Sequence, residues 1–169
     1  MFNFMLRALS GMVSAGEPLA VGASAPAIKG VNQDGQTVDL GQLYKQGYVL
    51  VFFYPMAGTP GCTAEACSLR DAFADLTKLN LAVVGVSHDS VEAQKAFATA
   101  HQLPFTLLAD PQSEIYNAFG VPGITRQSFL IKNGQVIWRD LHASTSQQAE
   151  DVKKALEADR AKVSTEEKK

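Results

Sequence analysis

The apolar run Tyr48-Val-Leu-Val-Phe-Phe-Tyr54 is followed directly by Pro55-Met-Ala-Gly-Thr59-Pro60-Gly61-Cys62. A continuous run of β-branched and aromatic residues predicts a strand that is buried on both faces of a sheet. The glycines and prolines after it predict a turn, and the next residues predict a helix with Cys62 in its first turn. A helix N-terminus offers unpaired N–H groups and a partial positive charge, so this position favours the reactive thiolate form of Cys62.

Strand patterns and helix patterns alternate on both sides of this stretch, which indicates an α/β fold with a mixed central sheet flanked by helices. Asp34-Gly35 and Asn133-Gly134 are hairpin turn signals. Asp89 and Glu92 resemble a capping box and predict a helix that begins there and runs through Phe97. Further strands are expected at 81–87, 105–109, 128–132 and 135–139, and further helices at 62–79, 113–119 and 146–161.

The composition bounds the class of protein. A chain of 169 residues is most simply one domain, and 15 basic against 17 acidic residues, without a basic block, argue against nucleic-acid binding. No apolar run has the length of a membrane span. Two cysteines in a chain of this size suggest redox chemistry or incidental burial, and the three histidines show no metal-ligand spacing. We therefore expect no metal and no cofactor.

The two ends of the chain carry no motif. Residues 1–20 are apolar at their start but lack a charged region before the apolar run, so we interpret them as a loosely docked extension of a cytoplasmic protein. The alternative is a targeting segment, which would place the protein outside the cytoplasm or in an organelle. Residues 21–160 are the predicted domain, and residues 161–169 are a charged tail that we expect to fray.

The spacing Pro55-x-x-x-Thr59-x-x-Cys62 resembles the active-site signature of the peroxiredoxins. The longer match Phe53-Tyr54-Pro55…Thr59-Pro60-Gly61-Cys62-Thr63-Ala64-Glu65-Ala66-Cys67…Arg70-Asp71 is similar to the bacterioferritin-comigratory, or peroxiredoxin Q, subgroup, and the resemblance covers residues 21–141. It implies a thioredoxin-like fold. One departure is that Met56-Ala57-Gly58 stands where the subgroup often carries charged residues.

The resemblance implies a role for each residue of the signature. Cys62 would attack the peroxide O–O bond and become a sulfenic acid. Thr59 would hydrogen-bond the peroxide and the thiolate, although a plain helix N-cap is also consistent with this residue. Pro55 would shield the site from water, although it also ends a strand.

Two charged residues complete the site that the resemblance implies. Arg126 would stabilise the thiolate and the negative charge of the transition state, the alternative being an ordinary loop arginine. Glu65 would orient Arg126, although a glutamate in a first helical turn is also a routine helix stabiliser.

Cys67 follows Cys62 by five residues on the predicted helix. This spacing separates the two Cα atoms by roughly 8–9 Å, whereas a disulfide needs about 4.4–6.8 Å. If Cys67 resolves the sulfenic acid, the first turns of the helix must therefore unwind. The alternative is a packed Cys67 and a one-cysteine mechanism.

Two function classes remain open from the sequence. The first is a thiol peroxidase that reduces hydrogen peroxide and organic hydroperoxides, acts as a monomer or weak dimer, and is recycled by thioredoxin or a similar dithiol through a Cys62–Cys67 disulfide. The second is a thioredoxin-like redox or copper-binding chaperone, for which only His142 is a candidate histidine ligand. Peroxide turnover distinguishes the first class from metal binding without turnover.

Overall fold

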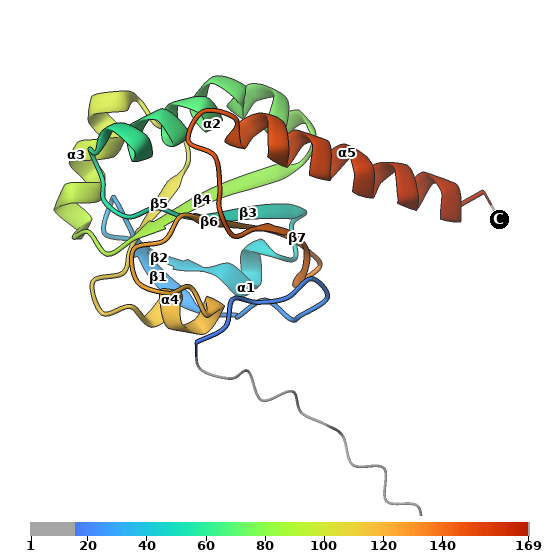
Figure 1. The fold of residues 1–169 in the computed structure, drawn as a ribbon, viewed down its shortest axis with the longest axis horizontal. Coiled ribbons are helices and arrows are strands. Elements are labelled where there is room, and N and C mark those ends of the chain that lie inside the picture. Colours follow the sequence, from blue (N-terminus) through green and yellow to red (C-terminus); the bar gives the residue numbers. More distant parts are fainter. Residues whose placement is uncertain (1–15, 169) are drawn as a thin grey trace, which may run out of the picture.

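The structure, a computed structural model, describes residues 16–168 and contains one seven-stranded mixed sheet (Figure 1). Its strand order is β2-β1-β5-β4-β3-β6-β7. Strands β3, β4 and β5 are parallel to one another, and the remaining neighbours pair antiparallel. The strands are β1 (Lys29–Asn32), β2 (Thr37–Asp39), β3 (Tyr48–Phe53), β4 (Leu81–Ser87), β5 (Thr106–Ala109), β6 (Gln127–Lys132) and β7 (Gln135–Asp140).

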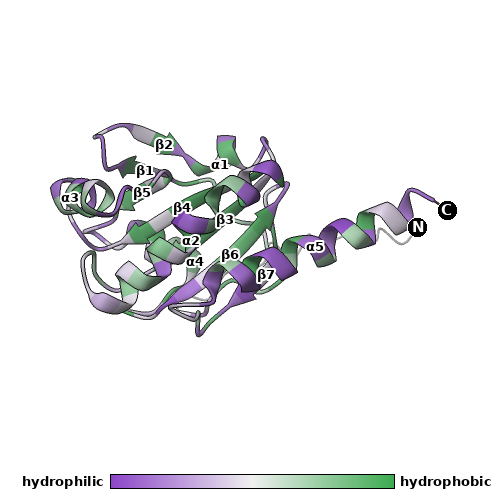
Figure 2. Cartoon of the chain, turned by 90° about the horizontal axis from the view of Figure 1, so that it is seen from above, coloured by the Kyte–Doolittle hydropathy of each residue, from purple (hydrophilic) through white to green (hydrophobic). Residues whose placement is uncertain are grey.

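Helices cover both faces of this sheet, as the alternation of patterns predicts. Helices α2, α3 and α5 lie on one face, and α1 and α4 lie on the other (Figure 1). The central strands are apolar, whereas hydrophilic residues are frequent along α5 (Figure 2). The helices are α1 (Leu40–Leu43), α2 (Pro60–Lys78), α3 (Val91–His101), α4 (Glu114–Phe119) and α5 (Gln148–Glu166).

Strand β3 lies between β4 and β6 and separates two hydrophobic cores. Because side chains alternate along a strand, Leu50 and Phe52 pack in the core beneath α2, α3 and α5, while Val51 and Phe53 pack in the core beside α4. All four are fully buried. The prediction of a strand buried on both faces is therefore confirmed, and its C-terminal end carries the chain directly into the turn before α2.

Both hairpin signals also occur where they were predicted. Strands β6 and β7 are joined by Asn133 and Gly134, whose φ angles of 50° and 76° fit a type I′ turn. Strands β1 and β2 are joined around Gly35, whose φ is 75°.

Two helix boundaries differ from the expectation. Helix α3 is capped by Ser90, whose hydroxyl accepts from the Ala93 N–H at 3.2 Å, because the Asp89 carboxylate is already engaged by the Ala57 N–H. The closing helix α5 does not end near residue 161 but continues to Glu166, since no glycine or proline interrupts it there. Most of the charged run that we expected to fray is thus helical and exposed.

The expected extension at residues 1–20 is described only from residue 16, so the proposed targeting or loosely docked character of residues 1–15 lies outside the described part. Leu19 is buried, and its N–H donates to the Phe119 carbonyl at 3.1 Å. Arg139 donates to the carbonyls of Pro18 and Leu19. The last residues of the expected extension are therefore tied to the domain and are not loosely docked.

Candidate active site

Cys62 lies at the third position of α2, just beyond the C-terminal end of β3. Thr59 is the N-cap residue, with an extended backbone, and Pro60 is the first helical residue, where its missing N–H costs nothing. The Cys62 side chain is buried, with 1% of its surface exposed. Its sulfur therefore lies at the positive end of the helix dipole and is shielded from water.

Arg126 reaches this sulfur from the loop before β6. Its Nη2 lies 3.5 Å from Cys62 Sγ, and its Nη1 donates to Glu65 Oε2 at 2.6 Å. A Cβ atom at Gly61 would lie 3.1 Å from Arg126 Nη2, so a glycine here lets the guanidinium approach the helix closely. The structure thus brings together Cys62, Glu65 and Arg126.

Burial and neighbouring charges set the protonation of Arg126 and Glu65. Burial opposes the charged form of Arg126, but Glu65 and Cys62 outweigh it and raise the Arg126 pKa above its ordinary value, so the guanidinium stays positive. Burial raises the pKa of Glu65 to about 7; Arg126 partly offsets this effect and Asp140 adds to it. A positive group therefore faces the sulfur at neutral pH, while its carboxyl partner is close to its own protonation midpoint.

Thr59 and Pro55 both belong to the segment that joins β3 to α2. The Thr59 hydroxyl donates to the Met56 carbonyl at 2.8 Å and makes no hydrogen bond as a helix cap. Its oxygen retains lone pairs that can accept a hydrogen bond from a bound peroxide. Pro55 follows Tyr54, the first residue after β3, and is half-buried.

Cys67 is half-buried on α2 and carries a free thiol, as does Cys62. The helix is continuous between them. The helical separation of roughly 8–9 Å therefore applies, and the two sulfurs cannot bond in this conformation.

Asp89 was predicted only to begin a helix, but the structure places it beside the turn that precedes α2. Its Oδ2 accepts from the Ala57 N–H at 2.8 Å and from the Ser87 hydroxyl at 2.5 Å. Ala57 belongs to the turn between Pro55 and Thr59, so Asp89 holds the turn that carries the signature. An aspartate beside a helix start is ordinarily interpreted as a cap. The backbone N–H that Asp89 binds belongs to Ala57, 32 residues away, so the local sequence could not indicate it.

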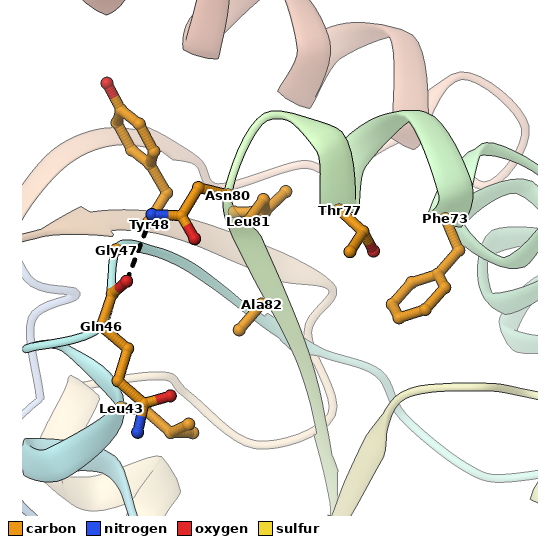
Figure 3. Close-up of a pocket in the computed structure, with 9 residues that line it drawn as sticks. All are labelled: Leu43, Gln46, Gly47, Tyr48, Phe73, Thr77, Asn80, Leu81 and Ala82. Atoms are coloured by element: carbon orange, nitrogen blue, oxygen red, sulfur yellow. Dashed lines mark hydrogen bonds between the residues drawn. The ribbon is translucent and has the colours of Figure 1, made fainter.

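A pocket of about 270 Å³ lies at the N-terminal ends of β3 and β4 (Figure 3). Cys62 follows the C-terminal end of β3, so the pocket is at the other end of that strand. It is lined by Tyr48 and Leu81, at the starts of β3 and β4, and by Phe73 and Thr77 of α2. It contains none of the signature residues.

Residues 16–168 contain no group of three or more His, Cys, Asp and Glu side chains that could hold a metal ion. His142 is exposed, and its backbone N–H donates to Asp140. Within the described part of the chain, no helix has both the length and the apolar character needed to cross a membrane.

Comparisons with known proteins identify the family of this chain. The AhpC/TSA family matches residues 21–139. The putative peroxiredoxin bcp of Haemophilus influenzae is 40% identical over 131 residues, covering 71% of this chain and 84% of that protein.

Two solved structures are also similar. The peroxidoxin BcpB of Mycobacterium tuberculosis superimposes with a TM-score of 0.78 and 30% identity, over 82% of this chain and 96% of that chain. The bacterioferritin comigratory protein of Xanthomonas campestris, described for its alkyl peroxide reduction activity, gives a TM-score of 0.75 and 25% identity, over 83% and 96% of the two chains.

The fold is therefore thioredoxin-like, and the protein is a thiol-dependent peroxidase of the peroxiredoxin class. Within that class the chain belongs to the AhpC/TSA family, in the bacterioferritin-comigratory and peroxiredoxin Q subgroup of atypical two-cysteine enzymes.

Proposed function

We propose that Cys62 is the nucleophile that reduces hydrogen peroxide and organic hydroperoxides, and that Cys67 resolves the product within the same chain. The observation that carries this proposal is the 3.5 Å contact between Arg126 Nη2 and the buried sulfur at the start of α2. A fixed cation and a helix N-terminus together favour the thiolate, which is the reacting species.

In the first step, the Cys62 thiolate attacks one peroxide oxygen. The S–O bond forms as the O–O bond breaks, and the other oxygen leaves as an alkoxide or hydroxide that takes a proton to become an alcohol or water. Negative charge grows on both oxygens, and Arg126 and the free N–H groups of the first helical turn stabilise it. Thr59 orients the peroxide, Pro55 limits access of water, and Glu65 acts as a positioning residue for Arg126.

In the second step, the Cys67 thiolate attacks the sulfur of the Cys62 sulfenic acid. An S–S bond forms, the S–O bond breaks, and hydroxide leaves and is protonated to water. Since the helical separation exceeds disulfide geometry, the first turns of α2 unwind before this step.

The disulfide then requires two electrons from a dithiol donor, and we assign this role to thioredoxin or a similar protein. Such donors work in reducing compartments, which favours the cytoplasm as the site of action. Because both cysteines belong to one chain, the cycle needs no second subunit, which is consistent with a monomer or weak dimer. The alkyl peroxide activity described for the Xanthomonas campestris protein supports organic hydroperoxides as substrates.

The direct test is consumption of hydrogen peroxide and of an organic hydroperoxide by the protein with thioredoxin and its reductase. We expect Cys62→Ser to abolish turnover and leave the fold intact, because the change replaces only one atom of a buried side chain. Circular dichroism of the variant checks the fold. Substantial turnover by a folded Cys62→Ser protein would exclude Cys62 as the nucleophile.

A further inference from the structure

The turn that carries the signature, residues 55–59 and here called the catalytic loop, has few hydrogen bonds to the rest of the protein. The Thr59 N–H and hydroxyl both bond to the Met56 carbonyl, which lies inside the loop. Among residues 16–168, the only hydrogen bond from another part of the fold to a loop residue, apart from the first bond of α2, is the one between the Ala57 N–H and Asp89. The position of the loop therefore depends strongly on one carboxylate.

Asp89 belongs to a ring of hydrogen bonds that begins and ends beside this loop. The Tyr54 hydroxyl donates to Gln94 Oε1, and Gln94 Nε2 donates to Ser87 Oγ at 2.9 Å. The Ser87 hydroxyl donates to Asp89, which accepts in turn from Ala57. Tyr54, Ser87 and Gln94 are buried, whereas Asp89 and Ala57 are half-buried. The ring is thus anchored in the core, and a connected network of this kind is rigid.

The Asp89 carboxylate is not needed to begin α3. Ser90 caps that helix, and the two bonds that Asp89 Oδ2 accepts both come from the ring. Bonds to an ionised acceptor are about twice as strong as neutral ones. Asp89 therefore applies a charge-assisted restraint to the loop three residues before α2 begins.

We propose that Asp89 is a positioning residue that keeps the catalytic loop folded around Cys62, and that its bond to Ala57 breaks before α2 unwinds toward Cys67. This inference rests on the proposed resolving role of Cys67. The loop is the upstream end of the segment that must move, so the first turns of α2 cannot rearrange freely while Ala57 is held.

The restraint sets the balance between two fates of the sulfenic acid. If the loop opens, Cys67 forms the disulfide; if it stays closed, a second peroxide oxidises the sulfenic acid to sulfinic acid and is itself reduced to alcohol or water. Weakening Asp89 should speed the first route and protect Cys62 from the second. It should also slow the initial attack on peroxide, because the loop is less well ordered.

The test compares Asp89→Asn, which keeps the shape but removes the charge, with Asp89→Ala, which removes both bonds. Amide hydrogen exchange in the reduced proteins measures opening at residues 57–66, and rapid-quench mass spectrometry measures disulfide formation after one equivalent of hydrogen peroxide. We expect Asp89→Ala to raise both rates by about tenfold, the factor for one charge-assisted bond, and Asp89→Asn to raise them by about threefold. The fraction of sulfinic acid at excess peroxide should fall in the same order.

Asp34→Asn is the matched control, because Asp34 is an exposed aspartate that pairs with Lys95 of α3, away from the loop. It should leave both rates unchanged. A purely structural role for Asp89 would lower stability to urea without changing the ratio of disulfide to sulfinic acid, and that result would overturn the proposal. Faster exchange without faster disulfide formation would also overturn it. A wild-type protein that forms no intramolecular disulfide would instead refute the role of Cys67, and unchanged exchange in the Asp89 variants would still refute the restraint on its own.

Discussion

Glu65 shows how burial and charge compete at a single residue of the site. Its side chain is fully buried, Oε2 accepts from Arg126, and Oε1 has no hydrogen-bond partner among the described residues. Asp140 also acts electrostatically on it. Burial is the largest of these influences and favours the neutral acid, whereas Arg126 favours the carboxylate.

This competition predicts a pH-dependent stability that Glu65→Gln removes. The Glu65 pKa rises from an ordinary 4.5 to about 7 in the folded protein, so the folded state binds the proton more tightly than the unfolded state. The stabilisation from the neutral acid is complete below pH 4.5 and is lost as the pH rises through about 7. We expect the wild type to lose about 3 kcal/mol of unfolding free energy relative to the glutamine variant over this interval. Urea titrations at several pH values measure the difference. A change of opposite sign would mean that the Arg126 charge outweighs burial.

At the scale of single elements, the sequence predicted the strands well because each apolar run is bounded by turn residues. It failed at α3 because Asp89 and Ser90 are both competent caps, and only the distant Ala57 N–H decides between them. The same limit applies to Arg126, which is separated from Cys62 by 64 residues, so periodicity could not place it and only the family spacing indicated it.

Helix α2 is the element whose change of state the proposed mechanism requires. We expect protected amides up to Arg70 in the reduced protein, beyond the unpaired first turn, and loss of that protection with some far-UV helical signal after oxidation. One equivalent of peroxide should remove two hydrogens from the mass, as an intramolecular disulfide requires. Cys67→Ser should stop at sulfenic acid, keep its helix, and proceed to higher oxidation states in excess peroxide. An oxidised wild type that retains the whole helix would rule out the unwinding step, and an intermolecular disulfide would rule out resolution within the chain.

At the scale of the whole molecule, the moving segment is part of one of the two cores. Cys62, Ala66 and Leu69 pack on the sheet in the core shared by α2, α3 and α5. The second core, beside α4, contains no residue of α2. Oxidation should therefore loosen one face of the sheet and spare the other, so that the oxidised protein stays folded but is less stable.

This asymmetry links stability to redox potential. Unwinding the start of α2 exposes Cys62 and Ala66, at a cost of about 3 kcal/mol, to which lost helical hydrogen bonds contribute. Folding and oxidation form a closed thermodynamic cycle. The difference in unfolding free energy between the reduced and oxidised forms therefore equals the difference in the free energy of reducing the disulfide between the folded and unfolded states. The folded disulfide should thus be more oxidising by roughly 60 mV. Urea unfolding of the reduced and oxidised forms gives one side of the cycle, and equilibration with a dithiol buffer, in native conditions and in denaturing urea, gives the other. Equal stabilities of the two forms, together with equal potentials, would show that the disulfide forms without disturbing the core. The free-energy cost that favours reduction of the folded disulfide by a dithiol donor would then be absent.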